Sequence, residues 1–405
     1  MPWVLRIILT FLPILLIAYI YSGWKLYYVF TRIFTWPTAQ IKWFILAAIA
    51  YLNLHPFLHL GIHQLGFETF SKSIREGHKL WDIFFTYPFW IGLIIIVEIL
   101  PWLLAADFIK LPFYPFYKRY KTTWLEVESW VVFGLVLLLT LLILFRVIID
   151  TNRVHITEVE LFVPTLPKTL NDFKIVHISD LQADPRTKPR KMRRYVKKVN
   201  KLKPDVVFFT GDLVSSGTKY IDSGAEILGT IDTRYGIYAC LGDHDIWSDP
   251  QRITDRLGAN EIVILEDENH YIHVGNDSLL LTFVTNAYSR RPRLDKLYAL
   301  MGTQPRGALD IVITHQPTES IIELAAERGY HLLLAGHTHG GQIVFRPFGF
   351  AFTPTQFESP YYKGCYFVDR MLVSINNGLG FTLAPFRYNA PAEVTLIKVV
   401  GDAAF

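Results

Sequence analysis

Val206-Val207-Phe208-Phe209-Thr210-Gly211-Asp212 joins a short apolar run to a glycine and a carboxylate. An apolar run of this length, ended by a turn residue, is typical of a strand that is buried on both faces of a parallel sheet. The carboxyl ends of such strands share one edge of the sheet, and ligands bind at that edge. We therefore expect Asp212 to lie at the ligand-binding edge of an α/β sheet.

Four further apolar runs also end in short polar motifs, in a fixed order along the second half of the chain. The runs are Lys174–Ile178, Ile237–Leu241, Ile311–Ile313 and Leu332–Leu334. The motifs that follow them are Asp180-Leu181-Gln182, Gly242-Asp243-His244-Asp245, His315 and Gly336-His337-Thr338-His339-Gly340. Carboxylates and imidazoles gathered at one sheet edge are suited to Zn, Fe or Mn. The sequence therefore predicts a metal site.

The composition of the chain changes near Asp150. Before this point the chain of 405 residues is largely apolar, and after it the charges are mixed and Gly and Pro are frequent. The second part is long enough for one α/β domain with a sizeable core. The formal net charge of +4 does not indicate a nucleic-acid partner, and none is expected. Two cysteines, Cys240 and Cys365, exclude a disulfide-rich scaffold, and Cys240 is expected to be a buried small hydrophobe.

The apolar first part contains four stretches that approach the ~20 residues a membrane helix needs. They are Val4–Tyr21, Ile41–Leu60, Phe84–Phe108 and Ser129–Ile149. The second and third contain polar residues and Pro, so re-entrant or interfacial arrangements stay open. The first is expected to be a retained helix, because no small-residue cleavage site follows it. Lys and Arg in the first and third connections favour a cytoplasmic location for them and an extracytoplasmic second part, although the middle connection is also basic.

Ionisable residues occur inside two of these stretches. His55, His59 and His63 are spaced four apart, on one helical face. Paired histidines in a membrane can hold haem or metal, but hydrogen bonding at the interface or between helices is the favoured interpretation. Glu98 lies deeper in its stretch and is expected to face the helix bundle, with a partner that the sequence does not identify.

Strands and helices alternate in the second part. Helices are expected at Pro189–Lys203, Asp249–Leu257 and Ser320–Arg328. A meander is expected from Glu261–Leu265, Tyr271–Val274 and Leu279–Val284. Another sheet near the end is expected from Tyr366–Val368, Leu372–Ile375 and Glu393–Val399. This pattern favours a sandwich of two sheets flanked by helices.

The five motifs, in this order, resemble the signature of calcineurin-like metallophosphoesterases from about His155 to Val400. Any single motif is weak, whereas five in order with strand context are highly specific. The membrane-associated bacterial branch is similar in further stretches, which are Val163–Pro167, Gly336–Gln342, Asn377–Gly380 and Pro385–Asn389. The resemblance implies an α/β (α+β) four-layer sandwich of two mixed sheets over residues 151–405, preceded by an all-α transmembrane region over residues 1–150.

The resemblance also implies a site for two divalent metal ions, Mn, Zn or Fe. Its ligands are Asp180, Asp212, Asp243, His315, His337 and His339. Asp212 would bridge the ions, Asp180 and His339 would complete the first site, and the remaining three would hold the second. His244 would face the scissile phosphate and help to protonate or stabilise the leaving oxygen. A hydroxide held between the ions would attack phosphorus in line.

Two residues depart from the family pattern. Gln182 stands where the family has His, and its neutral amide oxygen is a weaker ligand for Zn or Fe. Asp184, two residues on, is expected to be an ordinary turn carboxylate. Asp243 stands where the family has Asn, and its extra charge should tighten binding of the second ion. These changes favour Mn or Mg, and they keep a catalytically weakened protein as an alternative.

Basic and aromatic residues supply candidate substrate contacts. The segment from Arg186 to Lys203 holds ten basic residues and no acidic one, and it is either a solvated helix face or a surface for anionic headgroups. Arg186, Arg190 and Arg387 are candidate phosphate contacts. The aromatic stretch Phe345–Phe357 is either part of the core or an apolar wall for a lipid.

Three functions follow from these patterns. The favoured one is a phosphoesterase anchored in a bacterial inner or plasma membrane, acting on a phosphodiester or pyrophosphate in a lipid-linked or envelope molecule. The second is a phosphomonoesterase with a small soluble substrate. The third is a catalytically weakened membrane receptor for a phosphorylated ligand. The lipid bilayer is an expected partner in all three.

Overall fold

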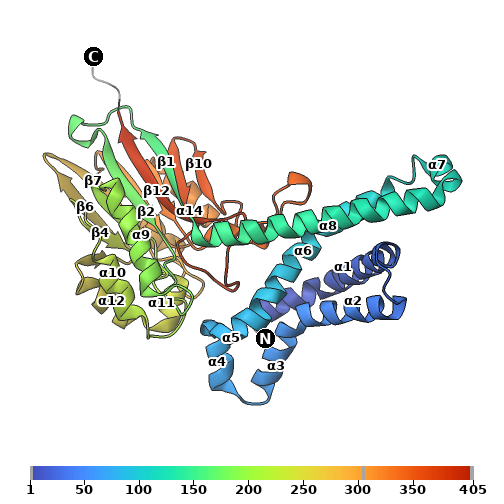
Figure 1. Ribbon diagram of the computed structural model, residues 1–405. Coiled ribbons are helices and arrows are strands. Elements are labelled where there is room, and N and C mark those ends of the chain that lie inside the picture. Colours follow the sequence, from blue (N-terminus) through green and yellow to red (C-terminus); the bar gives the residue numbers. More distant parts are fainter. Residues whose placement is uncertain (1–2, 303–305, 402–405) are drawn as a thin grey trace. The chain divides into compact units, whose positions relative to one another are not determined.

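The computed structural model describes residues 3–302 and 306–401. It divides into two compact units (Figure 1). The helical unit comprises Met1–Ile148 together with Phe345–Phe352, and the sheet unit comprises Ile149–Val344 together with Thr353–Phe405.

Long apolar helices form the helical unit, and a π-helical turn, Asp82–Thr86, joins two of them. The helices are α1 (Trp3–Ile33), α2 (Thr38–Leu52), α3 (Leu54–Gln64), α4 (Glu68–Gly77), α5 (Lys79–Trp81), α6 (Tyr87–Phe108), α7 (Tyr114–Arg119) and α8 (Lys121–Asn152). Among the described residues, three segments are long and apolar enough to cross a membrane: Pro13–Ile33, Lys79–Phe108 and Lys121–Asn152. A fourth span is possible only if α2 and α3, which are bent by 50°, form one broken span.

The break between α2 and α3 lies within the second predicted span. It falls at Asn53, which separates the two helices. Pro56 follows in the first turn of α3, where its missing N–H group removes no intrahelical hydrogen bond. The first candidate span, Pro13–Ile33, lies further along the chain than the predicted Val4–Tyr21, and the last one is longer than predicted because α8 begins at Lys121.

His55 and His59 form hydrogen bonds between short helices of this unit. The indole N–H of Trp81 in α5 donates to His55 Nδ1 over 2.9 Å. His59 Nε2 lies 3.1 Å from Ser71 Oγ in α4. The favoured interpretation, hydrogen bonding between helices, is confirmed for these two histidines.

A buried ionic cluster joins α1, α6, α8 and the connection after α6. Lys25 Nζ lies 2.5 Å from Asp107 Oδ1 and also contacts Glu128. Lys110 Nζ lies 2.8 Å from Asp107 Oδ1 and 2.9 Å from Glu128 Oε1. The Tyr21 hydroxyl donates to Asp107 Oδ2 over 2.6 Å. Two ammonium groups thus face two carboxylates, an arrangement that the sequence did not reveal.

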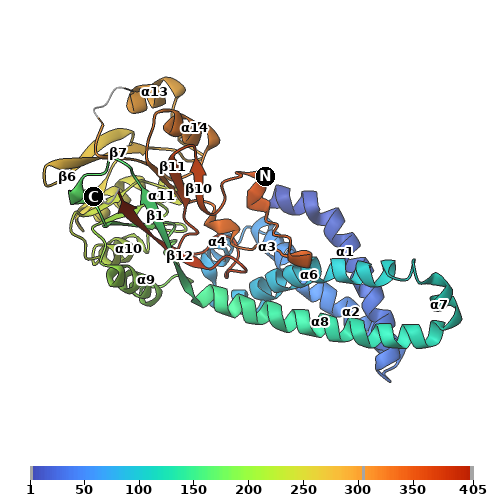
Figure 2. The ribbon, with the colours of Figure 1, turned by 90° about the horizontal axis from the view of Figure 1, so that it is seen from above.

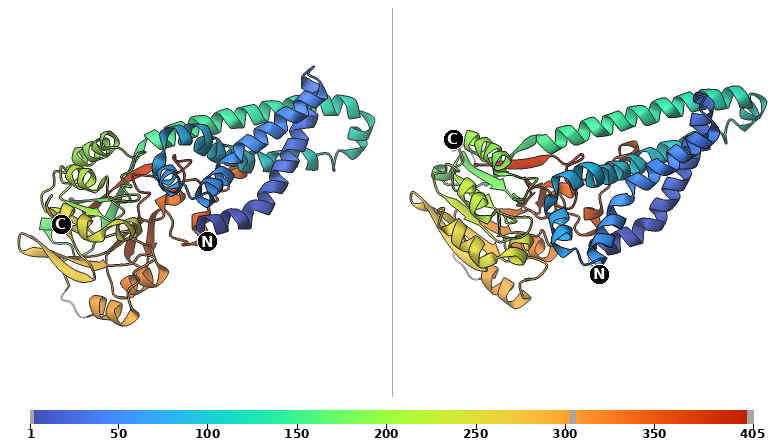
Figure 3. Two further views of the ribbon diagram at one scale, coloured as in Figure 1. Left: turned by 90° about the horizontal axis from the view of Figure 1, so that it is seen from below. Right: turned by 60° about the horizontal axis from the view of Figure 1, so that its bottom comes forward.

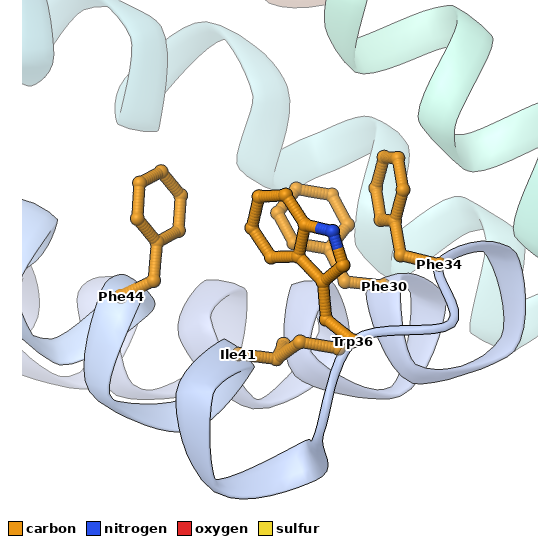
Figure 4. A pocket seen from close by; sticks show the side chains of 5 residues that line it. All are labelled: Phe30, Phe34, Trp36, Ile41 and Phe44. Atoms are coloured by element: carbon orange, nitrogen blue, oxygen red, sulfur yellow. The ribbon is translucent and has the colours of Figure 1, made fainter.

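An aromatic pocket lies where α1 turns into α2 (Figure 4). Its lining consists of Phe30, Phe34, Trp36, Ile41 and Phe44. None of these side chains is charged, so the pocket offers no group that would bind a phosphate or a metal ion.

The sheet unit contains two six-stranded sheets. The first has the strand order β1-β12-β2-β3-β4-β5 and the second β10-β11-β9-β8-β7-β6. The strands of the first sheet are β1 (Val154–Phe162), β12 (Ala392–Val400), β2 (Phe173–Ile178), β3 (Val206–Phe209), β4 (Ile237–Ala239) and β5 (Ile262–Ile264). The strands of the second sheet are β10 (Gly364–Val368), β11 (Met371–Ile375), β9 (Leu332–Ala335), β8 (Leu309–Thr314), β7 (Asp277–Val284) and β6 (Glu268–Val274).

Side chains of both sheets share one apolar core, to which Phe208 of β3, Leu281 of β7 and Leu334 of β9 belong. Helices cover the outer faces: α9 (Pro189–Leu202), α10 (Ile221–Leu228) and α12 (Pro250–Gly258) on the first sheet, and α13 (Leu294–Gly302) and α14 (Glu319–Glu327) on the second. Figure 2 shows α9 and α10 on one side of the strands and α13 and α14 on the other, and Figure 3 shows the same sandwich from two further directions. The predicted four-layer sandwich of two mixed sheets is confirmed.

Three expectations about the strands were wrong or incomplete. β10 and β11 extend the second sheet and β12 pairs with β1 and β2, so they form no separate sheet among the described residues. The expected meander is divided, because β5 belongs to the first sheet and β6 and β7 to the second. The edge strand β1 was not predicted, since Glu158 and Glu160 interrupt its apolar pattern.

Candidate metal centre

The five motifs meet at the carboxyl ends of strands from both sheets. Asp180 and Asp212 follow β2 and β3, Asp243 begins helix α11 (Asp243–Ser248) after β4, and His315 and His337 follow β8 and β9. Asp180, Asp212 and His337 have φ values of 50°, 61° and 67°. Left-handed backbone is strained for residues other than Gly and clusters at functional sites. The ends of the strands are therefore held in conformations that turn these side chains toward one another.

Glycines in the motifs allow the loops to approach closely. A Cβ atom at Gly336 would lie 2.5 Å from Asp180 Oδ2. At Gly242 a Cβ atom would lie 2.5 Å from the backbone nitrogen of Asp212. Real Cβ contacts are longer than this, so a side chain at either position would push two metal-binding loops apart.

Two groups of side chains are close enough to hold metal ions. They are Asp180, Asp212 and His315, and Asp243, His315 and His337, with the potential ligand atoms of each group within 4.8 Å of one another. His315 Nε2 lies 3.5 Å from Asp212 Oδ2 and 3.4 Å from Asp243 Oδ2. His315 was expected only at the second ion, but the geometry makes it available to both groups. The bridging role of Asp212 stays a prediction.

His339 and Gln182 lie beside the first group. His339 Nε2 is 3.3 Å from Asp180 Oδ1. The amide nitrogen of Gln182 donates to Asp212 Oδ2 over 2.7 Å. This bond uses the donor end of the amide, so its carbonyl oxygen is the end that is left for a cation.

Several buried atoms of this cluster have no hydrogen-bond partner among the described residues. They are Asp180 Oδ1, Gln182 Oε1, His315 Nε2 and His339 Nδ1. A buried polar atom without a partner costs about 1–3 kcal/mol. Carboxylate, amide and imidazole atoms of this kind are ligands for Mn, Zn and Fe. The residues therefore fit a pair of divalent ions.

The pKa values of the candidate carboxylate ligands are shifted in different directions. Burial raises the pKa of Asp212, although His315 and His244 act in the opposite direction. Burial also acts to raise the pKa of Asp243, but the nearby imidazoles of His315 and His337 outweigh it and hold that pKa far below its ordinary value. Among the three candidate carboxylate ligands, Asp212 is therefore the one whose pKa is raised, whereas the pKa values of Asp180 and Asp243 are lowered.

His244 lies beside the metal ligands and is oriented by the backbone. Its Nδ1 is 2.5 Å from the carbonyl oxygen of Ser215, so Nδ1 carries a proton and donates. Its backbone N–H donates to Asp212 Oδ1 over 2.9 Å. His244 Nε2 is then the ring atom available to a substrate, in keeping with the expected role.

Glu358 and Tyr288 belong to the site but were not identified from the sequence. The Tyr288 backbone N–H donates to Asp243 Oδ1 over 2.6 Å, and its hydroxyl donates to Glu358. Glu358 Oε1 lies 3.1 Å from His337 Nε2, and His337 Nδ1 lies 2.9 Å from Asp243 Oδ2. The four residues form a closed ring of polar contacts. Outer partners of this kind orient metal-binding histidines. Nothing in the local sequence around Glu358 signals this contact.

Asp245 was also missed as a structural residue of the site. Its carboxylate accepts hydrogen bonds from the backbone N–H groups of Gly242, Asp212 and Leu213, over 3.0, 2.8 and 2.8 Å. It therefore fixes the Asp212 loop against the Asp243 loop without being placed among the metal ligands.

The position of Arg387 does not support the predicted phosphate contact. Its side chain is fully buried and donates to the carbonyl oxygens of His339, Gly378 and Ala390 over 3.1, 3.1 and 3.0 Å. Its guanidinium therefore holds the loops behind the site together. Arg186 and Arg190 stay predictions; Arg190 is exposed at the start of α9.

The prediction that Asp184 is an ordinary turn carboxylate is confirmed. Its Oδ1 accepts from the backbone N–H groups of Arg186 and Thr187 over 2.7 and 2.6 Å. Cys240 is buried as expected.

Comparison with known proteins agrees with the site. Residues 173–341 match the family described as calcineurin-like phosphoesterase. The chain is 30% identical over 253 residues to a transmembrane protein with metallophosphoesterase domain from Danio rerio, covering 60% of this chain and 56% of that protein. It is 26% identical over 303 residues to an uncharacterised metallophosphoesterase of Campylobacter jejuni, covering 74% and 77%. The matched part of the chain is a calcineurin-like metallophosphoesterase domain, and its relatives occur in animals as well as bacteria.

The chain spans only part of some relatives. It covers 56% of the length of the matching transmembrane proteins from Danio rerio and Bos taurus. Together with the apolar helices of the helical unit, these relatives indicate a membrane protein.

Proposed function

We propose that this protein is a membrane-anchored, metal-dependent phosphoesterase that hydrolyses a phosphodiester or pyrophosphate bond. The observation that carries the proposal is the gathering of three carboxylates and three imidazoles at the carboxyl ends of strands from both sheets, with buried ligand atoms that have no hydrogen-bond partner among the described residues. Such a cluster is costly to keep unless cations bind to it.

The proposed ligands divide between two ions. Asp180, Gln182 and His339 belong to one ion, Asp243 and His337 to the other, and Asp212 and His315 lie between them. When bound, the ions would lower the pKa of a shared water and offset the charge of the phosphoryl oxygens. The preferred metal follows from the ligand set, which is rich in oxygen because Gln182 replaces a His and Asp243 replaces an Asn of the family pattern. These replacements favour Mn or Mg.

His244 is the proposed proton donor to the leaving oxygen. Because the Ser215 carbonyl holds the proton on Nδ1, transfer takes place at Nε2. The proposed contacts to the substrate phosphate are Arg186, which precedes α9, and Arg190, which lies in its first turn. Arg387 is not proposed as a phosphate contact, because its N–H groups already donate to backbone carbonyl oxygens.

The proposed substrate is a lipid-linked or envelope phosphate in a bacterial inner or plasma membrane, with the sheet unit outside the cytoplasm. Apolar helices support the bilayer as a partner. Basic residues of α9 support attraction to anionic headgroups, at about 1 kcal/mol per residue near the surface. Labelling intact cells with an impermeant thiol reagent tests the orientation, using Ser216→Cys in a chain without Cys240 and Cys365. Labelling only after lysis would exclude every extracytoplasmic substrate.

Hydrolysis of model esters tests the chemistry before the substrate is known. Purified full-length protein with added Mn or Zn should cleave bis-p-nitrophenyl phosphate faster than p-nitrophenyl phosphate. A preference for the monoester would favour a phosphomonoesterase. Cleavage of neither ester with any divalent metal would contradict the proposal and favour a receptor.

A further inference from the structure

A short hairpin of the helical unit lies in the sequence between two segments of the sheet unit. Phe345 and Phe352 exchange backbone hydrogen bonds of 2.8 Å in both directions, and these residues bound what we call the 345–352 hairpin. The hairpin begins six positions after His339 and ends six positions before Glu358. Its turn contains Pro347, Phe348 and Gly349.

The hairpin is fixed to the apolar helix α6. The backbone N–H of Arg346 donates to Glu98 Oε1 over 2.6 Å, and the rings of Trp102 and Phe348 lie 4.6 Å apart. Glu98 is buried and precedes the end of α6 at Phe108 by ten residues, which is ~15 Å along a helix axis. A hydrocarbon layer is ~30 Å thick, so this contact lies at membrane depth if α6 spans the bilayer.

The backbone of the hairpin is largely satisfied by its own contacts. Gly349 donates to Arg346 over 3.0 Å and Phe350 donates to Pro347 over 3.1 Å, while Phe345 and Phe352 pair with each other. Arg346 donates to Glu98, and Pro347 has no N–H group. Irregular backbone at membrane depth requires such internal partners, because lipid offers none.

The side chains at the tip are apolar and exposed. Phe350 is 78% exposed and Phe348 48%. Exposed aromatic side chains on a soluble surface would forgo ~1.5–3 kcal/mol each of burial free energy. If the apolar helices of this unit cross a membrane, the surroundings of these side chains are hydrocarbon chains, with which they pack favourably. Because the hairpin tip continues the apolar surface of these helices, we take hydrocarbon chains as the molecules that contact Phe348 and Phe350.

We propose that the tip of the 345–352 hairpin is an acyl-chain binding element, at which Phe348 and Phe350 contact the hydrocarbon tail of a bilayer amphiphile. Glu98 is the positioning residue that holds the hairpin on α6 through the Arg346 backbone. The further step, that this tail belongs to the phosphorylated substrate, rests on the proposed function. The contact with lipid does not.

Quenching by lipid tests the contact directly. Phe350→Cys, in full-length protein without Cys240 and Cys365, is labelled with bimane and reconstituted into phosphatidylcholine vesicles that contain doxyl-labelled phosphatidylcholine. Leu138→Cys on α8 and Tyr298→Cys on α13 are matched controls, because both residues are about half exposed. We expect position 350 to be quenched like position 138. Quenching no greater than at position 298 would overturn the proposal.

A substrate comparison tests whether the tail belongs to the substrate. Phe350→Ser should lower the ratio of kcat/KM for dioleoylphosphatidyl-p-nitrophenol to kcat/KM for bis-p-nitrophenyl phosphate by about tenfold. Glu98→Leu should lower the same ratio, because the Arg346 backbone N–H loses its acceptor. If the ratio is unchanged while lipid quenches position 350 strongly, the hairpin contacts lipid but does not contact the tail of the substrate. If the wild type hydrolyses neither ester, the proposed function fails, while the quenching result still decides the lipid contact.

Discussion

Asp107 and Glu128 of the helical unit lie within 3 Å of lysine ammonium groups, whereas the carboxylates of the metal centre have no such partner. The close partners of Asp212 and Asp243 are histidines, side-chain amides and backbone N–H groups. The first cluster holds two cations and two anions and is neutral by itself. The second gathers three carboxylates whose ion-pair partners among the described residues are histidines, with no Lys or Arg. A buried cluster whose carboxylates are paired with lysines serves structure, and one whose carboxylates face only potential metal ligands is a site for added cations.

Asp212→Asn removes charge from the cluster that lacks cations, and it should have the largest effect. We expect a loss of more than about 100-fold in kcat/KM for bis-p-nitrophenyl phosphate, because even outer partners of a metal ligand cost 10–100-fold. Asp222→Asn is the matched control, since Asp222 forms exposed ion pairs with Arg252 and Arg256. Near-normal turnover by Asp212→Asn would show that this carboxylate does not serve the reaction.

Lys25→Met removes one cation from the neutral cluster and should act on stability. Leaving Asp107 and Glu128 undercompensated should lower the free energy of unfolding by about 3–5 kcal/mol. Thermal unfolding of the full chain in detergent measures this, with Lys42→Met as the exposed control. The Mn content per folded chain should be unchanged. Loss of Mn with unchanged stability would reverse the roles assigned to the two clusters.

Glu358→Gln weakens an outer partner of the metal centre. The change should lower the affinity for one of two ions by about 10–100-fold, because His337 loses a charged acceptor. Equilibrium dialysis against Mn measures both affinities, and Glu323→Gln on the exposed face of α14 is the control. Tyr288→Phe should add little to Glu358→Gln, since the two residues share one ring of contacts. Full additivity would mean that the ring is not one unit.

Gln182→His restores the family ligand and should have the smallest effect. An imidazole binds Zn more strongly than an amide oxygen, so the affinity for the first ion should rise about tenfold or less. Zinc titration of both forms measures the change. Identical binding curves would remove Gln182 from the coordination sphere.

The central strands and the gathering of the candidate metal ligands could be predicted because both have a local signature. Val206–Phe209 is buried along its whole length, and its apolar run shows this directly. The ligands follow at the strand ends, so the order of the motifs also predicted their meeting. Strand β1 was missed because it lies at an edge and carries charged residues.

The remaining errors concern residues whose role depends on tertiary contacts. The sequence around Arg387 does not distinguish an arginine that donates to buried carbonyls from one that binds phosphate. Glu358 gains its role only because its segment returns to His337. The partner of Glu98 is a backbone N–H group far along the chain, and such a donor has no sequence signature.

Metal stoichiometry tests the central claim most directly. Full-length protein is dialysed against Mn, separated from free metal and analysed by inductively coupled plasma mass spectrometry, beside Asp212→Asn and Asp222→Asn. We expect about two Mn per chain for the wild type and for Asp222→Asn, and a loss of at least one for Asp212→Asn. No bound metal in the folded wild type, or equal amounts in all three proteins, would contradict the account.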